Sequence, residues 1–467
     1  MAQLNADKCF IFTDTETTGL DINFSQIIQV GSILTDEDIQ IEDKQDLDCN
    51  LLPWIIPSPE AFLVHKKTSS LGKSSMSHYD MMRELRDKWL SWSKERNPVF
   101  ITYNGHRFDE ELFRRQFYWN LLPPYITNTE GATRLDLLFT FQLLANFFPE
   151  RLKIPTSSEG DISLKLTDWA EANQVSSEGA HDALEDCLLM VNLSKLVQKN
   201  AKEAWNASLK GSSKNGNLEL LQSDPFTLLG EVVRKKKFVY PITYCGQNLK
   251  MGNEIAVVDL YADPNLLDEL TDEELSEQIG GSGAIIRKLK INRSLPIISS
   301  SNVPNLNIFL DESPQLLKER ANQVRENLRL QNRISEILTN NQPQYPEPKY
   351  LEQTVYSGFA SHADELWMER FSCALWEEKA KLIQGFGDPR YKNLAERVVC
   401  TNSPECMTKE SMKRHNAFVI TRQNDKGPWL NKEKALQKIS KLMPNVEKEE
   451  KDILEKVRSY LNSPSQQ

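Results

Sequence analysis

The sequence lacks any apolar run long enough to cross a membrane, and it lacks the marks of a secretory leader. The stretch from Leu51 to Ile56 is among its longest apolar runs, but Pro53 interrupts it. A spanning helix needs about 20 apolar residues. Residues 1–7 contain no basic segment followed by an apolar one, as a leader would. We therefore expect no membrane partner.

Paired cysteines and cysteine-based metal motifs are also missing. The seven cysteines are scattered, and they form neither a C-x-x-C pair nor a cluster with histidines. An odd number of dispersed thiols is typical of a reducing compartment. We therefore expect a cytoplasmic location and no structural zinc site.

An excess of basic residues, the usual mark of a nucleic-acid-binding protein, is missing too. The chain has 56 Lys and Arg against 66 Asp and Glu, and the acidity lies almost wholly in residues 1–199. An enzyme that binds divalent cations through carboxylates is an exception to this rule, because the bound cations invert the local charge. Net charge therefore does not exclude nucleic acid as a partner.

The order of expected elements predicts three domains. Apolar runs of strand length alternate with helical patterns in the first 200 residues, which predicts an α/β domain with a mixed sheet. The expected strands of this part are residues 9–13, 27–34 and 99–103, and the expected helices are residues 109–119, 164–173 and 182–197. Residues 206–217 are small and polar, which favours a linker or a long loop.

After this segment, short strands are expected at residues 239–244, 254–260 and 285–291, followed by a helix over residues 314–339. A proline-rich connector, residues 340–348, precedes a region that is mostly helical. The predicted domain bounds are therefore residues 1–200, 201–350 and 351–467.

Two carboxylates lie at the end of the first expected strand. Asp14 and Glu16 are two positions apart, so their side chains point to the same face of the strand. Two convergent carboxylates can hold Mg²⁺ or Mn²⁺, which prefer oxygen ligands. The Thr17-Thr18-Gly19 turn that follows would let the backbone approach a ligand. The alternative is an acidic strand end that faces solvent.

Two further acidic motifs open expected helices. Asp109 follows the strand at residues 99–103 and begins a helix, and His181 and Asp186 lie at the start of another. Each motif also has a purely structural interpretation, because helix N-termini favour acidic residues. The four carboxylates and the histidine, taken together and in this order, are much more specific than any one motif.

This set resembles the DEDDh branch of the proofreading exonucleases. The residues after Asp109, the later segments 257–260 and 356–359, and the order of all these segments resemble bacterial exonuclease I, a 3′→5′ exonuclease specific for single-stranded DNA. The resemblance implies a ribonuclease H-like exonuclease domain, then an SH3-like β-barrel domain, then a helical C-terminal domain. It also implies a positively lined channel for single-stranded DNA.

The resemblance further implies two Mg²⁺ ions per active site, with Mn²⁺ as a substitute, and release of 5′-mononucleotides in DNA repair and recombination. Asp14, Glu16 and Asp186 would be direct metal ligands, Asp109 a direct or water-mediated ligand, and His181 the general base. The expected substrate contacts are Glu16, Thr17, Thr18, Leu20, Arg114, Tyr125 and Lys165. The family has an arginine at the position of Lys165, so the charge is kept but bidentate phosphate binding is lost.

The implied partners are single-stranded DNA and the C-terminal tail of single-stranded-DNA-binding protein, and the chain is expected to be a monomer. Two other functions stay open: a DEDDh exoribonuclease acting on RNA 3′ ends, and a non-catalytic adaptor that binds single strands. The known exoribonucleases of this branch are single domains of about 200 residues, which the long C-terminal part argues against. The complete set of five catalytic residues argues against the adaptor.

Overall fold

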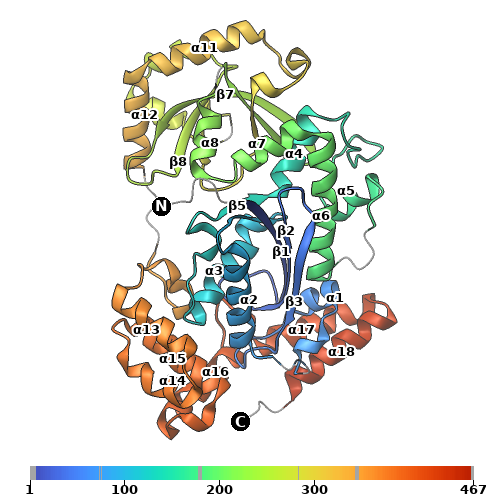
Figure 1. Cartoon of the computed structure of the whole chain (residues 1–467), viewed down its shortest axis with the longest axis vertical. Coiled ribbons are helices and arrows are strands. Elements are labelled where there is room, and N and C mark those ends of the chain that lie inside the picture. The colour runs from blue at the N-terminus through green and yellow to red at the C-terminus, as the bar shows by residue number, and fades with distance from the viewer. Residues whose placement is uncertain are drawn as a thin grey trace.

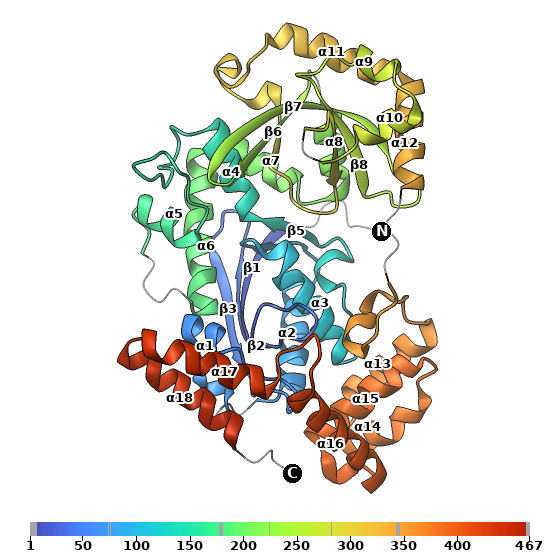
Figure 2. The ribbon, with the colours of Figure 1, turned by 180° about the vertical axis from the view of Figure 1, so that it is seen from behind.

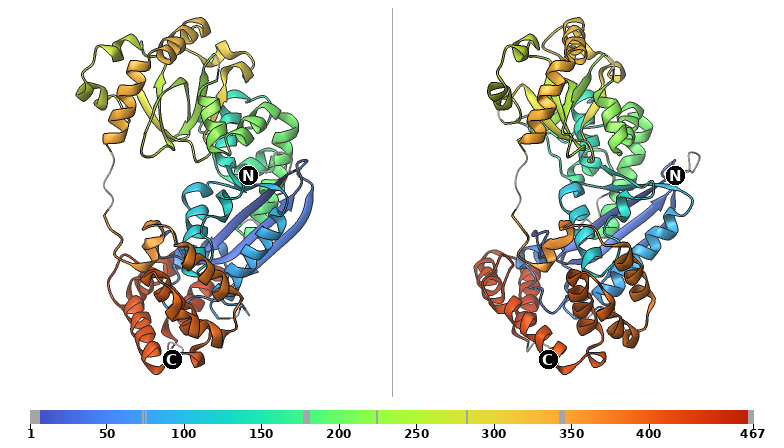
Figure 3. Two further views of the ribbon diagram at one scale, coloured as in Figure 1. Left: turned by 60° about the vertical axis from the view of Figure 1, so that its left-hand side comes forward. Right: turned by 90° about the vertical axis from the view of Figure 1, so that its left-hand side faces the viewer.

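The computed structural model describes residues 7–463, with the exception of residues 73, 75, 177–180, 224, 282 and 342–345. Figure 1 shows three parts stacked along the long axis of the molecule, with the first sheet in the middle. The second sheet lies at one end and the C-terminal helices lie at the other, and the side views of Figure 3 show the same order.

The first sheet is mixed, as expected. Its strands, in the order β3-β2-β1-β4-β5, are β1 (Lys8–Thr17), β2 (Ile27–Thr35), β3 (Ile41–Asp48), β4 (Asn97–Thr102) and β5 (Thr133–Asp136). Strand β1 pairs antiparallel with β2 and parallel with β4. The sequence did not predict β3, whose residues are mostly polar, or β5, which has only four residues.

Helices cover both faces of this sheet, and β1 therefore contributes to two cores. Phe10 and Phe12 pack on one side with helices α4 (Leu137–Phe147) and α6 (Ala183–Asn200). Cys9 and Ile11 pack on the other side with α2 (His78–Ser93) and α3 (Asp109–Trp119). Because side chains alternate along a strand, the side chains of Asp14 and Glu16 continue the α6 side and that of Thr15 continues the α3 side.

The expected linker at residues 206–217 is wrong. Helices α7 (Lys202–Lys210) and α8 (Lys214–Leu221) occupy this segment. The two remaining helices of the first part are α1 (Pro59–His65) and α5 (Leu166–Ala172).

The second sheet is antiparallel. Its strands, in the order β10-β6-β7-β8-β9, are β6 (Thr227–Val233), β7 (Lys236–Gln247), β8 (Glu254–Asp259), β9 (Ile286–Lys290) and β10 (Ile297–Ser299). Its helices are α9 (Asn265–Asp268), α10 (Asp272–Glu277), α11 (Pro314–Glu326) and α12 (Leu328–Asn340). The single helix expected over residues 314–339 is therefore two helices that meet at Asn327. The SH3-like barrel stays a prediction.

The core of the first sheet continues into the second part. Phe226, Leu228 and Ile298 are buried in the same cluster as Phe10 and Phe147. The predicted bounds at residues 200 and 350 stay predictions, because a shared core does not mark where one folding unit ends.

The C-terminal part is helical, as expected. A 3₁₀ turn, η6 (Leu351–Tyr356), precedes α13 (His362–Cys373), α14 (Trp376–Leu382), α15 (Pro389–Asn402), α16 (Lys409–Asn424), α17 (Lys432–Leu442) and α18 (Lys448–Asn462). Figure 2 shows α17 and α18 beside α1, and Phe62 of α1 packs with Ile439 and Leu454. Among the described helices, none has the length and apolar character that a bilayer crossing requires.

Candidate active site

Strand β1 supplies two carboxylates on the side covered by α6. Asp14 and Glu16 follow Phe12 in alternation, and the residues before them are buried. The strand pairing changes register between Glu16 and Thr17, so the chain leaves the sheet just after the second carboxylate. Asp14 and Glu16 are thereby placed at the end of β1, as the two-residue spacing predicted.

Helix α6 brings the third carboxylate, Asp186, against β1. A glycine makes the close approach possible: a Cβ atom on Gly31 of β2 would lie 2.3 Å from the carbonyl oxygen of Ala183, and Gly31 pairs with Asp14. One carboxylate oxygen from each of Asp14, Glu16 and Asp186 lies within 4.8 Å of the others. This is the arrangement that the sequence predicted for these three residues.

Asp109 lies beside this group on the other side of β1. It begins α3, and its Oδ1 accepts a short hydrogen bond from the Oγ1 of Thr15. A Cβ atom on Gly105 would lie 3.0 Å from Asp109 Oδ2, so a small residue is suited to this position. Asp109 is not part of the three-carboxylate group, but its charge acts on Asp14.

Burial and mutual repulsion oppose ionisation of these carboxylates. Burial raises the pKa of Glu16 to about 8, and the charges of Asp186 and Asp109 act in the same direction. Burial raises the pKa of Asp109 to about 7, against the hydrogen bond from Thr15. The pKa of Asp14 is raised for the same reasons, first by burial and then by the other three carboxylates. A bound cation would relieve this repulsion.

His181 lies just before α6. Its side chain is exposed, its φ of 71° is left-handed, and its backbone N–H donates to Asp186 Oδ2 at 3.3 Å. Residues 177–180, immediately before it, lie outside the described residues. The structure therefore places His181 next to one of the three carboxylates.

The turn after β1 is fixed by hydrogen bonds of its threonines. Thr17 Oγ1 donates to Gly19 O at 2.9 Å, and Thr18 Oγ1 accepts from the backbone N–H of Gln26 at 2.9 Å. Leu20 follows the turn with 86% of its side chain exposed. An exposed leucine beside partly buried carboxylates is available to a ligand rather than to the core.

Arg114 and Tyr125 form a surface with two aromatic residues of the C-terminal part. Arg114 Nη1 donates to the hydroxyl of Tyr356 at 2.6 Å, and its guanidinium carbon lies 5.2 Å from the ring centroid of Tyr125. The rings of Tyr125 and Phe359 lie 5.7 Å apart, and Phe359 is 84% exposed. We call Arg114, Tyr125, Tyr356 and Phe359 the aromatic platform.

The sequence analysis did not assign Tyr356 and Phe359 to the site. The two aromatics flank Gly358, whose φ is 115°, and this local pattern was the one available signal. Tyr356 contacts Arg114 and Phe359 contacts Tyr125. Both contacts join residues more than 230 positions apart, which spacing along a chain cannot reveal.

Lys165, the other expected phosphate contact, is exposed at the residue before α5. Its backbone N–H donates to Ser163 Oγ at 3.2 Å. Within the described residues its side chain has no recorded ion pair, and its role stays a prediction.

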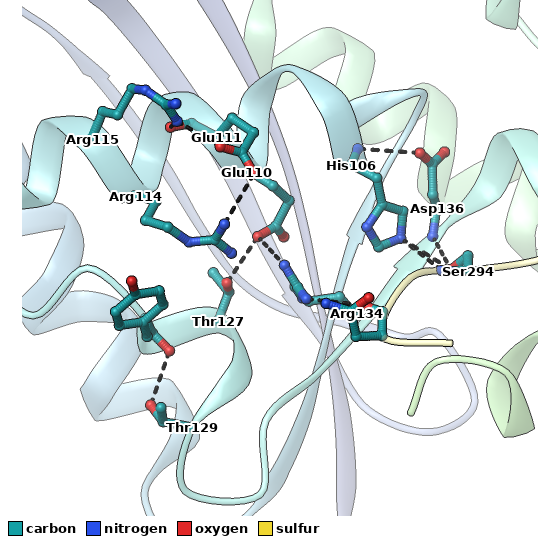
Figure 4. A network of polar contacts seen from close by, with 12 residues as sticks. His106, Glu110, Glu111, Arg114, Arg115, Thr127, Thr129, Arg134, Asp136 and Ser294 are labelled. Atoms are coloured by element: carbon teal, nitrogen blue, oxygen red, sulfur yellow. Dashed lines mark hydrogen bonds and ion pairs between the residues drawn. The ribbon is translucent and has the colours of Figure 1, made fainter. Parts of the chain in front are cut away.

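A polar network, shown in Figure 4, joins the connection between β9 and β10 to the segment that precedes Asp109. His106 Nε2 lies 3.1 Å from Ser294 Oγ, which in turn accepts from the backbone N–H of Asp136 at 2.9 Å. Arg134 donates to Glu110 and to Asn292 O. Burial lowers the pKa of His106 to about 3, so this histidine is neutral and structural. The sequence analysis gave it no role.

Two family models match the chain at the positions of these features. Residues 11–194, which include Asp14 and Asp186, match the model described as "Exonuclease". Residues 349–464, which include the platform residues Tyr356 and Phe359, match "Exonuclease I C-terminal domain". The chain is therefore similar to an exonuclease domain in its first part and to the C-terminal domain of exonuclease I in its last part.

Curated relatives and solved structures show the same similarity. Exodeoxyribonuclease I of Buchnera aphidicola from Schizaphis graminum is 23% identical over 441 residues, covering 90% of this chain and 86% of the relative. Exodeoxyribonuclease I of Escherichia coli is 24% identical over 378 residues, covering 77% of this chain and 78% of the relative.

Among solved structures, exonuclease I of Methylocaldum szegediense superimposes with a TM-score of 0.83 at 22% identity, covering 97% of this chain and 98% of that one. Escherichia coli exonuclease I in complex with a dA16 oligonucleotide gives 0.82 at 20% identity, covering 97% and 99%. These likenesses establish the exonuclease I fold for the chain.

Proposed function

We propose that this exonuclease I relative is a metal-dependent exodeoxyribonuclease that removes nucleotides from single-stranded DNA in the 3′→5′ direction. The observation that carries the proposal is the group formed by Asp14, Glu16 and Asp186, with Asp109 beside it. The curated relatives are named for the same activity. Roles in DNA repair and recombination are part of the proposal because of the same similarity to exodeoxyribonuclease I.

The carboxylate group fits a divalent cation. Its donors are all oxygens, it is partly buried, and its members raise one another's pKa, as expected of ligands that share a cation. We propose that Mg²⁺ is the natural ion, in a pair held by Asp14, Glu16, Asp186 and Asp109. Such ions lower the pKa of a bound water and neutralise charge on the phosphate.

The remaining residues position the strand and move one proton. We propose that His181 accepts, on an imidazole nitrogen, a proton from the attacking water. Hydrolysis adds the hydroxide to phosphorus and a proton to the departing 3′-oxygen, and it releases a 5′-mononucleotide. The turn at Thr17 and Thr18, with the exposed Leu20, would hold the terminal nucleotide.

The aromatic platform is a reason to propose single-stranded rather than duplex DNA as the substrate. Exposed aromatic rings stack on unpaired bases, and the bases of a duplex are already stacked on one another. The guanidinium carbon of Arg114 lies 5.2 Å from the ring centroid of Tyr125 and 5.8 Å from that of Tyr356. Its charge is paired with Glu111 at 3.0 Å, so we propose that Arg114 fixes the two rings in place. We propose that Lys165 makes a single-point phosphate contact nearer the first sheet.

The proposed protein partner is the C-terminal tail of single-stranded-DNA-binding protein. The support is the crystal structure of SSB/exonuclease I in complex with the inhibitor CFAM. Its chain matches this one with a TM-score of 0.79 at 20% identity, covering 98% of this chain and 99% of that one. A monomeric state and a cytoplasmic location stay predictions.

One assay tests the activity and the main alternative together. Single-stranded DNA, duplex DNA and RNA, each labelled at the 5′ end, are incubated with the protein in Mg²⁺ or in EDTA. We expect ladders that shorten from the 3′ end only for single-stranded DNA with Mg²⁺. Preferential digestion of RNA would favour the exoribonuclease, and binding without digestion would favour the adaptor. Undiminished cleavage in EDTA would overturn the metal site.

A second test addresses the platform. Phe359→Ala should raise the KM for an oligonucleotide of about 16 nucleotides and leave kcat unchanged. Loss of a stacked base costs about 1–3 kcal/mol, which corresponds to about 5- to 150-fold. Ile420→Ala removes another exposed apolar side chain, on α16, and serves as the matched control. An unchanged KM in Phe359→Ala would remove the platform from the binding site.

A further inference from the structure

A lysine that the proposed mechanism does not use lies between α1 and α6. Helix α1 ends at His65. The residue after it, Lys66, has a left-handed φ of 59°, and Lys67 follows. The backbone N–H of Lys67 donates to His65 Nδ1 at 2.9 Å, and its carbonyl accepts from Ser70 Oγ at 3.0 Å. Both backbone polar groups of Lys67 are therefore hydrogen-bonded, which fixes the position of its Cα atom.

The side chain of Lys67 reaches the start of α6. Its Nζ forms a short ion pair with Asp182 Oδ2, and the two side chains are only 26% and 29% exposed. The same carboxylate caps α6 by accepting from the backbone N–H of Leu184 at 3.1 Å, and it accepts from Gln29 Nε2 at 3.3 Å. Asp182 therefore connects three elements: the turn after α1, strand β2 and helix α6.

This connection lies directly beside the candidate active site. Gln29 pairs with Glu16 across β1 and β2, and Asp182 is the neighbour of His181 in the chain. The charge of Lys67 also acts on Glu16, whose pKa it lowers against the effect of burial and the nearby carboxylates. Lys67 thus lies within electrostatic reach of a metal ligand while it contacts the residue next to the general base.

His181 needs an external support. A left-handed φ is unfavourable for a residue with a Cβ atom, and the ring is exposed rather than packed. A general base must stay within hydrogen-bond reach of the water it activates. Displacement of about 1 Å can cost about 10²-fold in rate.

We propose that Lys67 is a positioning residue for His181, which acts by holding Asp182 through their ion pair. The inference rests on the proposed function, since it concerns the general base of that reaction. It assigns Lys67 no contact with DNA. The competing role is a direct phosphate contact by the Lys67 ammonium.

The test is a double-mutant cycle on the full-length protein, with kcat and KM measured on 5′-labelled single-stranded DNA. Lys67→Met removes the charge and keeps the length of the side chain. Asp182→Asn removes the opposite charge and keeps an oxygen to cap α6. We expect each variant to lose about 10- to 100-fold in kcat with KM unchanged, and the double variant to be no worse than either. Lys67→Arg should recover most of the rate.

Lys66→Met is the matched control. Lys66 is the neighbouring lysine and pairs with Glu449 of α18 at 3.2 Å, where both side chains are well exposed. We expect it to keep the wild-type kcat and KM. Thermal melts of all variants show whether any loss of rate is a loss of folded protein.

The decisive experiment measures the effect of Lys67→Met on the rate when His181 is already replaced by alanine. If Lys67 acts through His181, the added substitution should change nothing. A further loss of rate, a raised KM in Lys67→Met, or additive effects of Lys67→Met and Asp182→Asn would each overturn the inference. An active wild-type protein with an unimpaired Lys67→Met variant would overturn this inference alone, whereas an inactive wild-type protein would overturn the proposed function.

Discussion

At the scale of single residues, Asp14 shows how strongly the site depends on a counter-charge. Its carboxylate is partly buried, and the charges of Asp109, Asp186 and Glu16 all oppose its ionisation. Like charges that are held together in a folded protein destabilise it, because unfolding separates them. The site is therefore arranged for binding cations at the expense of stability.

Asp14→Asn should therefore separate activity from stability. The substitution removes one charge and keeps the shape, so we expect no measurable nuclease activity and, in metal-free buffer, a melting temperature equal to or above that of the wild type. The measurements are thermal melts in EDTA and digestion assays in Mg²⁺. Asp38→Asn, at an exposed position, is the control and should change neither. A lowered melting temperature for Asp14→Asn would contradict the charge-repulsion argument.

The raised pKa of Glu16 predicts how metal binding depends on pH. Its pKa is about 8 in the folded protein against an ordinary value of 4.5. A raised folded-state pKa stabilises the metal-free protein below about pH 4.5, and this stabilisation is lost as pH rises to about 8. Mg²⁺ binds the ionised form, so we expect it to raise the melting temperature more at pH 8.5 than at pH 5.5. Equal increases at both values would contradict the shift.

At the scale of secondary-structure elements, the sequence predicted the strands and helices that carry the candidate catalytic residues. Strands β1, β2 and β4 are apolar runs buried on both faces, which is a strong local signal. The helix expected at residues 109–119 has the bounds of α3. The i and i+2 spacing placed Asp14 and Glu16 on one face of β1, and Asp186 does join them. His181, Asp109 and the substrate contacts keep their roles as predictions.

The parts of the fold that could not be predicted from the sequence are those that depend on tertiary contacts. Residues 206–217 were predicted to form a linker or a long loop because they are rich in glycine, serine and asparagine. In the structure, parts of α7 and α8 form there instead. Asn217 is fully buried, and its Nδ2 donates to the carbonyl oxygens of Gly211, Ile291 and Arg293. A Cβ atom on Gly216 would lie 1.8 Å from Lys210 O. These polar and small residues serve packing between distant segments, a role that composition alone does not distinguish from a flexible loop.

The contact of β2 with α6 gives a prediction at this scale. Gly31→Ala would place a methyl group 2.3 Å from Ala183 O, so α6 must shift away from β1 and carry Asp186 with it. We expect a loss of about 1–3 kcal/mol in the free energy of unfolding and a lower kcat. Urea unfolding and kinetic assays measure the two effects. Gly387→Ala, where the new methyl group would meet atoms no closer than 3.6 Å, is the control and should be close to neutral.

At the scale of the whole molecule, the parts share their cores. Ile28 and Phe62 of the first part are buried by residues of α17 and α18. Tyr118 and Trp119 of α3 pack with Phe371 and Leu394 of the C-terminal helices. The aromatic platform also takes residues from both parts. The site is therefore a property of the whole chain rather than of its first 200 residues.

This sharing predicts that residues 1–200 will not fold alone. Removal of residues 201–467 would expose Ile28, Phe62 and Trp119, and it would remove Phe226 and Leu228 from the main core. We expect an aggregated product or one that binds a hydrophobic dye and melts without cooperativity, measured beside the full-length protein. A cooperative transition near the full-length melting temperature would show that the first part is autonomous.

The packing of α18 on α1 also has a consequence for synthesis. About 390 residues separate Phe62 from the residues of α18 that cover it. Translation proceeds at roughly 5–20 residues per second. Phe62 is therefore synthesised about 20–80 s before the residues of α18 that bury it. We therefore expect the nascent chain to be bound by ribosome-associated chaperones over this interval, and the nuclease to gain its active shape only after translation has passed α18.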